Sequence, residues 1–89
     1  MRVYKYRLLL AGLPQTLPLP TLARPLHVAV QDGELTLWAL VDPAAPPGRR
    51  QFLVCGTGQE LGLSLVSSLY LGTATSGAFV WHVFEVWPS

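Results

Sequence analysis

The 89-residue chain has few charged residues, and asparagine and isoleucine are absent from it. Charged side chains make up 12% of the sequence, against roughly 25% in an average soluble domain, while 51% of the residues are hydrophobic. Intrinsic disorder needs low hydrophobicity and high charge, so this composition excludes it. Six basic against five acidic residues also leave no large electrostatic footprint for nucleic acid. The shortage of charge predicts instead that an apolar surface faces another subunit, and we expect a homo-oligomer.

A single cysteine, Cys55, excludes an intrachain disulfide. Two histidines without a second cysteine do not provide the ligand spacing of a structural zinc site, so we expect neither a metal nor a cofactor. Small domains that lack these devices often depend on association, which again favours an oligomer. The unpaired thiol fits a cytoplasmic protein.

No formally charged residue occurs from Leu61 to Phe84, a run of 24 residues that is long enough to span a bilayer. Three glycines and four serines interrupt this run, and its second half alternates with a period of two. The run therefore predicts buried strands and no transmembrane helix. The apolar segment near the start of the chain is too short for a signal peptide, and prolines follow it at once.

Turn signals recur at the spacing that is typical of all-β domains. The sequence predicts a single domain over residues 1–89, an antiparallel sandwich or barrel of about seven short strands with at most one short helix. The ambiguous segment is Thr57–Ser68, whose first residues fit a capping box that would start a helix. Gly58 and Gly62 would weaken such a helix, so a loop is favoured there.

The clearest unit is a hairpin over Leu26–Val41, because Asp32-Gly33 suits a two-residue turn in which both residues need positive φ. This turn places Val30 opposite Leu35, Val28 opposite Leu37 and Leu26 opposite Ala39 on an apolar face. His27 then lies opposite Trp38 on a more polar face, so register and pattern agree.

The other strands are predicted from shorter patterns. Val3–Leu10 alternates as a half-buried strand with its basic groups outward, and prolines restrict Gln15–Leu19 to an edge strand. Asp42–Arg49 is expected to form a proline-rich surface loop, followed by a short apolar strand over Gln51–Cys55.

A second hairpin is predicted over Leu69–Val86, with its turn at Ser76-Gly77. This register places Gly72 opposite Trp81, so that the tryptophan covers a strand glycine. Both faces of Phe79–Trp87 are apolar, which is typical of a central strand or of a strand at a subunit interface.

Several runs occur in the order and spacing of a known family, namely VYKY, QTLPLP, LHVAVQDGELTLWALVDP, FLVCGTG, YLGT and FVWHVFE. With these motifs the chain resembles, over nearly its whole length, an uncharacterised family of small bacteriophage and prophage proteins. The resemblance implies a phage or prophage origin, a compact β fold and the cytoplasm of a host cell as the location. It implies no catalytic residue and no cofactor. The sequence departs from the family in its proline-rich loop and in Glu60–Ser68, where relatives carry more charge.

Groups that could support catalysis are few. Cys55 lies in an apolar strand, where it is better interpreted as a small buried hydrophobe than as a nucleophile. No nucleophile-elbow motif surrounds any serine. His82 and Glu85 are expected on opposite faces of one strand. We therefore expect that the protein is not an enzyme.

Aromatic, arginine and glycine residues are better candidates for a ligand site. A tryptophan on the polar face of the first hairpin is not needed for the core, so Trp38 and its partner His27 could stack on a ligand or contact another subunit. The glycine-rich turn could present backbone N–H groups to a phosphate beside an arginine pair, although an ordinary β-turn and a solvated loop end are the simpler alternatives. The candidate ligand-binding residues are His27, Trp38, Arg49, Arg50, Gly56, Thr57 and Gly58.

Aromatic residues of the last strand are candidates for a subunit interface, namely Phe79, Trp81, His82 and Trp87. These features support two hypotheses. In the first, a non-enzymatic phage accessory protein captures a small phosphorylated or nucleotide-like ligand as a homo-oligomer and acts in host takeover or against host defence. In the second, the apolar surface docks on a host or phage protein, or the chain is a structural part of the virion.

Overall fold

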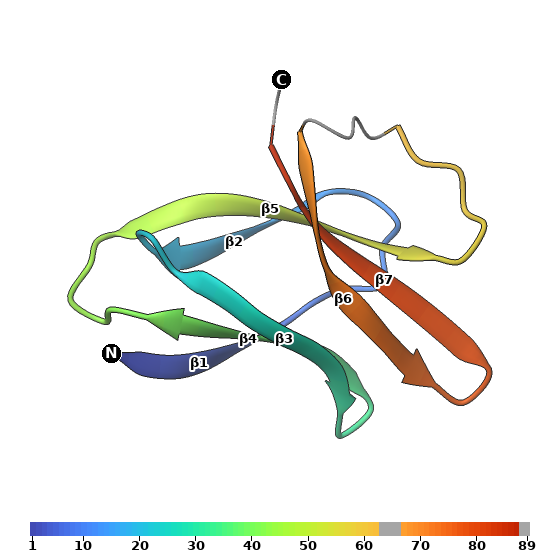
Figure 1. Cartoon of the computed structure of the whole chain (residues 1–89), viewed down its shortest axis with the longest axis horizontal. Coiled ribbons are helices and arrows are strands. Elements are labelled where there is room, and N and C mark those ends of the chain that lie inside the picture. The colour runs from blue at the N-terminus through green and yellow to red at the C-terminus, as the bar shows by residue number, and fades with distance from the viewer. Residues whose placement is uncertain (63–66, 88–89) are drawn as a thin grey trace.

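The computed structural model describes residues 1–62 and 67–87, which form seven β-strands and no helix (Figure 1). The predicted all-β fold of about seven short strands is therefore confirmed. Within Thr57–Ser68 the described residues are not helical, and residues 63–66 lie outside the described part. No helix in the described ranges could span a membrane. The strands are β1 (Arg2–Arg7), β2 (Gln15–Pro20), β3 (Arg24–Gln31), β4 (Glu34–Val41), β5 (Pro47–Gly56), β6 (Ser68–Ser76) and β7 (Phe79–Val86).

The strands form two antiparallel sheets with the orders β1-β4-β3 and β2-β5-β7-β6. Together the sheets make an open sandwich, with β3 of one sheet packed against β6 of the other (Figure 1). Apolar side chains from the facing surfaces of both sheets build the core. The most deeply buried are Leu19, Val28, Leu37, Val41, Phe52, Val54 and Val83.

The first hairpin has the predicted turn, since Asp32 (φ 51°) and Gly33 (φ 77°) both adopt positive φ. The predicted register is confirmed from Gln31 back to His27. The expected pairing of Leu26 with Ala39 is wrong, because a bulge after Pro25 places that proline opposite Ala39. Proline has no N–H for the ladder, and a bulge is one of the places where a sheet tolerates it.

The second hairpin is present, but the predicted register is wrong. The turn is Gly77-Ala78, with Gly77 at φ 59°, because a type II′ turn places glycine at its first central position. Trp81 therefore faces Ala74, and Gly72 faces Val83. As expected for a strand that is apolar on both faces, β7 is central, between β5 and β6.

At Gly72 the two sheets approach each other closely. A Cβ atom added to this residue would lie 2.8 Å from Cγ2 of Val28 on β3, closer than real Cβ contacts come. Val28 is fully buried, so it has little space into which to move. The absence of a side chain at position 72 therefore lets β6 pack directly against β3.

Two prolines block the free edge of β2, which confirms the prediction of an edge strand. The N–H of Thr21 donates to the carbonyl of Pro46 at 2.9 Å, in the same register as the β2–β5 ladder. Since antiparallel residues alternate in the direction of their hydrogen bonds, Pro18 and Pro20 face away from β5. Both lack an N–H, so this edge offers few donors to another strand.

Two predicted boundaries are wrong. The strand expected at Gln51–Cys55 begins at Pro47, because pairing with β2 holds residues 47–50 extended, and the proline-rich loop is shorter than expected. The strand expected at Val3–Leu10 ends at Arg7, and its side chains are mostly exposed apart from half-buried Tyr6.

Replacing Gly72 with alanine tests the close approach of the sheets. We expect Gly72→Ala to lower the free energy of unfolding by about 1–3 kcal/mol, because the added methyl group overpacks the contact with Val28. Urea denaturation measures this loss. The matched control is Gly48→Ala, where the new Cβ would meet its nearest atom at 3.8 Å, and it should stay within about 0.5 kcal/mol of the wild type. Equal stability of the two variants would contradict the packing described here.

Candidate functional site

Two aromatic residues of β7 form the centre of the candidate site. Phe79 and Trp81 are two residues apart, so their side chains share one face of the strand. The rings stack with centroids 5.9 Å apart and an interplanar angle of 13°. Phe79 is nevertheless 65% exposed. Stacking covers only one side of its ring, so the other side is open to a ligand.

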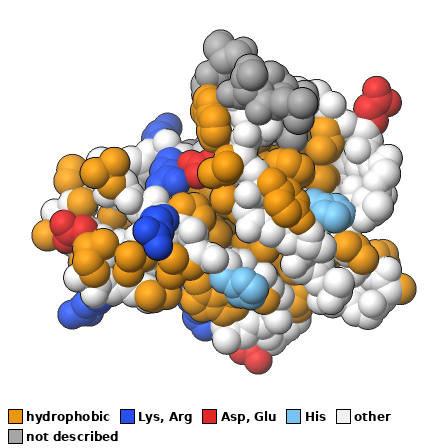
Figure 2. All heavy atoms as spheres, in the orientation of Figure 1, with side chains coloured by type: hydrophobic (Ala, Val, Ile, Leu, Met, Phe, Trp, Pro, Cys, Tyr) orange, Lys and Arg blue, Asp and Glu red, His pale blue; other side chains and the backbone are white. Residues whose placement is uncertain are grey.

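The Phe79–Trp81 stack lines a cleft of about 350 Å³, here called the hairpin cleft, between the turns of the two hairpins. Both turns lie at the lower right in Figure 1. The lining is mainly apolar and comes from both sheets and the segment after β1, namely Leu10, Val30, Gly33, Leu35, Ser76, Phe79 and Trp81. It contains no charged residue. On the face shown in Figure 2, basic side chains lie on the left half, away from the β6–β7 hairpin.

The glycine-rich turn lies beside the same aromatic pair. Gly56 is the register partner of Trp81, and Gly56 and Thr57 line a second hollow of about 270 Å³ with Ala78, Phe79 and Val80. The structure therefore brings Gly56 and Thr57, predicted as ligand contacts, next to Phe79 and Trp81, predicted as interface residues.

The turn itself is a β-turn closed by a hydrogen bond from the N–H of Gln59 to the carbonyl of Gly56, at 3.2 Å. Gly58 has a φ of 82°, as the third residue of a type II turn requires. The N–H of Gly56 donates to Oε1 of Gln59, also at 3.2 Å. Of the three amides predicted to face a phosphate, that of Gly56 is thus engaged within the turn.

His82 lies on the opposite face of β7, held between two threonines. Its Nε2 is 2.7 Å from Oγ1 of Thr57, and its Nδ1 is 3.2 Å from Oγ1 of Thr73, which also contacts the hydroxyl of Tyr70. A neutral imidazole donates through one nitrogen and accepts through the other, so both ring positions are satisfied. The chain of hydroxyls ties the glycine-rich turn to the four-stranded sheet.

His27 and Trp38 pair across β3 and β4 as predicted, with ring centroids 6.1 Å apart and tilted by 35°. They lie on the outer surface of the three-stranded sheet and line neither hollow. Trp87 follows the last residue of β7, at the end of the strand away from Phe79, and is also outside both hollows.

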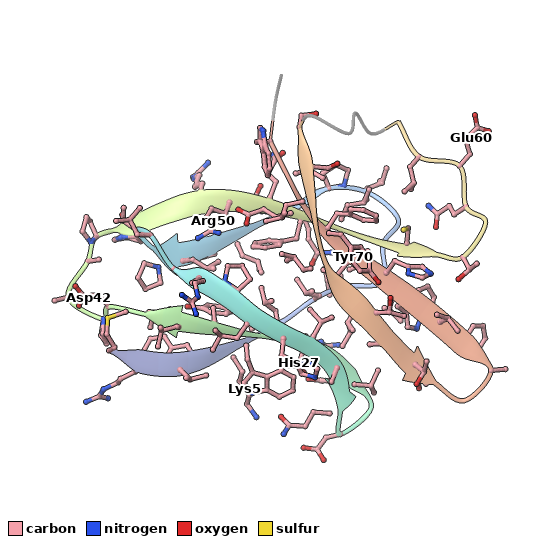
Figure 3. All side chains as sticks on the ribbon, viewed as in Figure 1. Lys5, His27, Asp42, Arg50, Glu60 and Tyr70 are labelled. Carbon is pink, nitrogen blue, oxygen red and sulfur yellow. The ribbon has the colours of Figure 1, made fainter. Side chains whose placement is uncertain are left out.

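Arg50 is part of the framework of the fold. Its guanidinium binds Glu85 through two hydrogen bonds, Nε to Oε2 at 2.6 Å and Nη2 to Oε1 at 2.7 Å. Its Nη1 donates to the carbonyl of Ala23 in the β2–β3 connection, and Figure 3 shows the side chain between β5 and β3. The carboxylate of Glu85 raises the pKa of Arg50 above its ordinary value. The sequence predicts Arg49 and Arg50 as ligand contacts, with a solvated loop end as the alternative. The loop end is wrong for both, because β5 begins at Pro47, and Arg50 is engaged by Glu85 while Arg49 is exposed on the other face.

Sequence reasoning missed Glu85 as the partner of Arg50, although the pattern of β7 holds a signal. Glu85 continues the alternating set that contains Phe79, Trp81 and Val83, so it falls on an apolar face. A charge on such a face needs an opposite charge nearby. Sequence reasoning also missed the cleft residues Leu10, Val30 and Leu35, which come from segments far apart in the chain.

Comparison with protein families supplies one match, which covers residues 1–89 and is described as a domain of unknown function (DUF7352). The chain belongs to the DUF7352 family. Neither the curated proteins nor the solved structures contain a match to it.

Cys55 of this DUF7352 chain is 3% exposed, and burial raises the pKa of its thiol. A raised pKa lowers the thiolate fraction near neutral pH, and the thiolate is the reactive form. The structure therefore places Cys55 in the sheet as a small buried side chain, in agreement with its apolar sequence context.

Glu85→Gln tests the internal ion pair of this DUF7352 chain. We expect a loss of about 2 kcal/mol in unfolding free energy, because a partly buried guanidinium loses its charged partner. Replacing both residues, as Arg50→Met with Glu85→Leu, should cost less than Glu85→Gln alone. The control is Arg7→Ala, which breaks an exposed pair with Glu34 and should cost below about 1 kcal/mol. Urea denaturation compares the variants, and a similar small loss for Glu85→Gln would contradict the structural role.

The thiol of Cys55 should be unreactive while the chain is folded. At pH 8 a disulfide reagent such as DTNB should label the native protein far more slowly than the urea-unfolded protein, because burial hinders both access and ionisation. Absorbance of the released thiolate follows the reaction. Equal labelling rates in the folded and unfolded protein would contradict the burial of Cys55.

Proposed function

We propose that this DUF7352 chain is a non-enzymatic binding protein that takes up a small planar aromatic ligand in the hairpin cleft. The observation that carries the proposal is the open ring face of Phe79, held in place by its stack on Trp81. Planar ligands gain from offset stacking on such a face. A cleft of about 350 Å³ lies at the small end of ligand sites, which suits a group the size of a nucleobase.

The chemistry of the lining favours the aromatic part of a nucleotide-like ligand over its phosphate. Neither hollow contains a basic residue, and Arg50 is engaged by Glu85. In the hairpin cleft the side chain of Ser76 supplies a polar group to the lining, whereas the hydroxyl of Thr57 is engaged by His82. A phosphate group would therefore stay in solvent, and the ligand would be recognised by stacking.

A phage or prophage accessory role is part of this proposal, supported by the sequence motifs shared with small phage proteins. In that role the protein would act in the host cytoplasm, sequestering a small ligand during host takeover or against host defence. The non-enzymatic part of the proposal is supported by the buried state of Cys55.

Association of copies is also part of the proposal. Two large apolar side chains that line the cleft are strongly exposed, Leu10 and Phe79, and so are Leu9 and Leu13 in the segment after β1. A second copy that covers them would close the cleft and enclose the ligand between subunits. The same residues favour the alternative, in which a host or phage protein covers the surface and no small ligand is bound.

Isothermal calorimetry with adenosine, adenosine monophosphate and indole tests ligand binding. We expect a Kd below about 1 mM for at least one of these compounds, and similar values for adenosine with and without its phosphate. Phe79→Ala should weaken binding about tenfold or more, as the loss of one stacking contact predicts. The control is Leu69→Ala, which removes a side chain of comparable exposure (53%) outside both hollows and should bind like the wild type.

Two results would contradict the proposal. One is the absence of binding by all three compounds up to millimolar concentration, which would favour the protein-interaction alternative. The other is unchanged binding by Phe79→Ala. Sedimentation equilibrium tests association separately, since a mass of 9.7 kDa at the concentration used for calorimetry would contradict a homo-oligomer.

A further inference from the structure

β1 is an edge strand with hydrogen-bonding groups that face away from its sheet. The N–H of Leu8 donates to the carbonyl of Leu35 at 2.9 Å, in the same register as the β1–β4 ladder. Residues of an antiparallel strand alternate in the direction of their backbone bonds, so Tyr4 and Tyr6 also bond to β4. The N–H and C=O groups of Val3, Lys5 and Arg7 therefore point away from β4.

The other strand edges of the described sheets carry devices that hinder pairing. The free edge of β2 presents Pro18 and Pro20, which lack N–H donors. β3 carries Pro25 and a bulge, and β6 carries a bulge at Leu71. Bulges and prolines are the usual means by which sheets prevent edge-to-edge association. β1 has neither, and its sequence RVYKYR contains residues that favour extended structure.

The charge of β1 determines which strand it would accept. Arg2, Lys5 and Arg7 lie within six residues, and no acidic residue occurs in the first thirty positions. Arg7 forms an ion pair with Glu34, with 3.3 Å between Nη1 and Oε1. Nζ of Lys5 donates to the neutral Oε1 of Gln31 at 2.9 Å. Figure 3 shows Lys5 pointing away from the molecule. Two copies of β1 side by side would bring six basic side chains together without an acid on either strand.

We propose that the free edge of β1 binds an extended acidic segment of another protein by β-strand addition. The added strand would extend the sheet beyond β1, with main-chain hydrogen bonds to the outward groups of Val3, Lys5 and Arg7. Carboxylates at alternate positions of the incoming strand would lie over Lys5 and Arg7 on one face. This surface is separate from the hairpin cleft, so the interaction does not depend on the proposed ligand.

Fluorescence anisotropy with a labelled peptide tests the interaction in the full-length chain. The probe alternates glutamate and valine over about ten residues, the length of a long strand, and its counterpart alternates lysine and valine. We expect the glutamate peptide to bind, with an affinity that falls as salt is raised, and the lysine peptide not to bind. Lys5→Gln combined with Arg7→Gln should weaken binding about tenfold and reduce its salt dependence.

Position 3 provides a matched pair of variants. Val3→Pro removes one outward N–H and leaves the β1–β4 hydrogen bonds intact, so it should abolish most of the binding. Val3→Thr keeps the N–H and should bind like the wild type. The inference is overturned if the glutamate peptide fails to bind, if Val3→Pro binds as well as Val3→Thr, or if the lysine peptide binds equally. It is also overturned if Val3→Pro dissociates an oligomer of the wild type, since the occupant of the edge would then be a second copy. If Val3→Pro does not fold, the test rests on Lys5→Gln combined with Arg7→Gln, and unchanged binding of the glutamate peptide by that variant overturns the inference.

Discussion

The contact between Val28 and Gly72 is the constraint on which the rest of the structure depends. Because position 72 has no side chain, β6 packs directly against β3, and the two sheets meet along these strands. The same contact brings the turns of both hairpins to one end of the sandwich, where the hairpin cleft lies between them. The strand orders place β1 and β2 at the edges of their sheets that lie away from this contact. The hairpin cleft therefore depends on the packing of the two sheets, and the open edge of β1 depends on the strand order of its sheet.

Two groups of charged residues differ in their surroundings: the Arg50–Glu85 pair is largely buried, and the basic residues of β1 are exposed. Arg50 and Glu85 are joined between β5 and β7, and Arg50 also binds the β2–β3 connection, so this pair fixes the sandwich and is not available to a ligand. The basic residues of β1 remain exposed, where they can meet a partner. Large apolar side chains are also exposed, including the ring of Phe79. One ion pair therefore supports the fold, basic side chains stay exposed on β1, and the lining of the hairpin cleft is mainly apolar.

Sequence alone predicted the elements better than their assembly. Asp32-Gly33 determined the first hairpin because few other dipeptides accept two positive φ values, and prolines identified β2 as an edge. The alternating pattern did not determine the register of the second hairpin. Next to the turn the observed pairing differs from the predicted one by two residues, which leaves each side chain on the same face, and a bulge between Tyr70 and Gly72 reduces the difference to one residue further along the strand. The register is set instead by Gly77, which takes the first central position of the turn. The cleft could not be predicted locally, since Leu10, Val30 and Trp81 meet only when both sheets pack.

Hydrogen exchange along β1, followed by two-dimensional NMR of the full-length chain, tests most directly the claim that the edge of β1 is open. The structure predicts alternation, with slow exchange for the amides of Tyr4, Tyr6 and Leu8, which face β4, and fast exchange for those of Val3, Lys5 and Arg7. Uniformly slow exchange along the strand would contradict this account, because it would mean that the edge of β1 is already covered in the isolated protein.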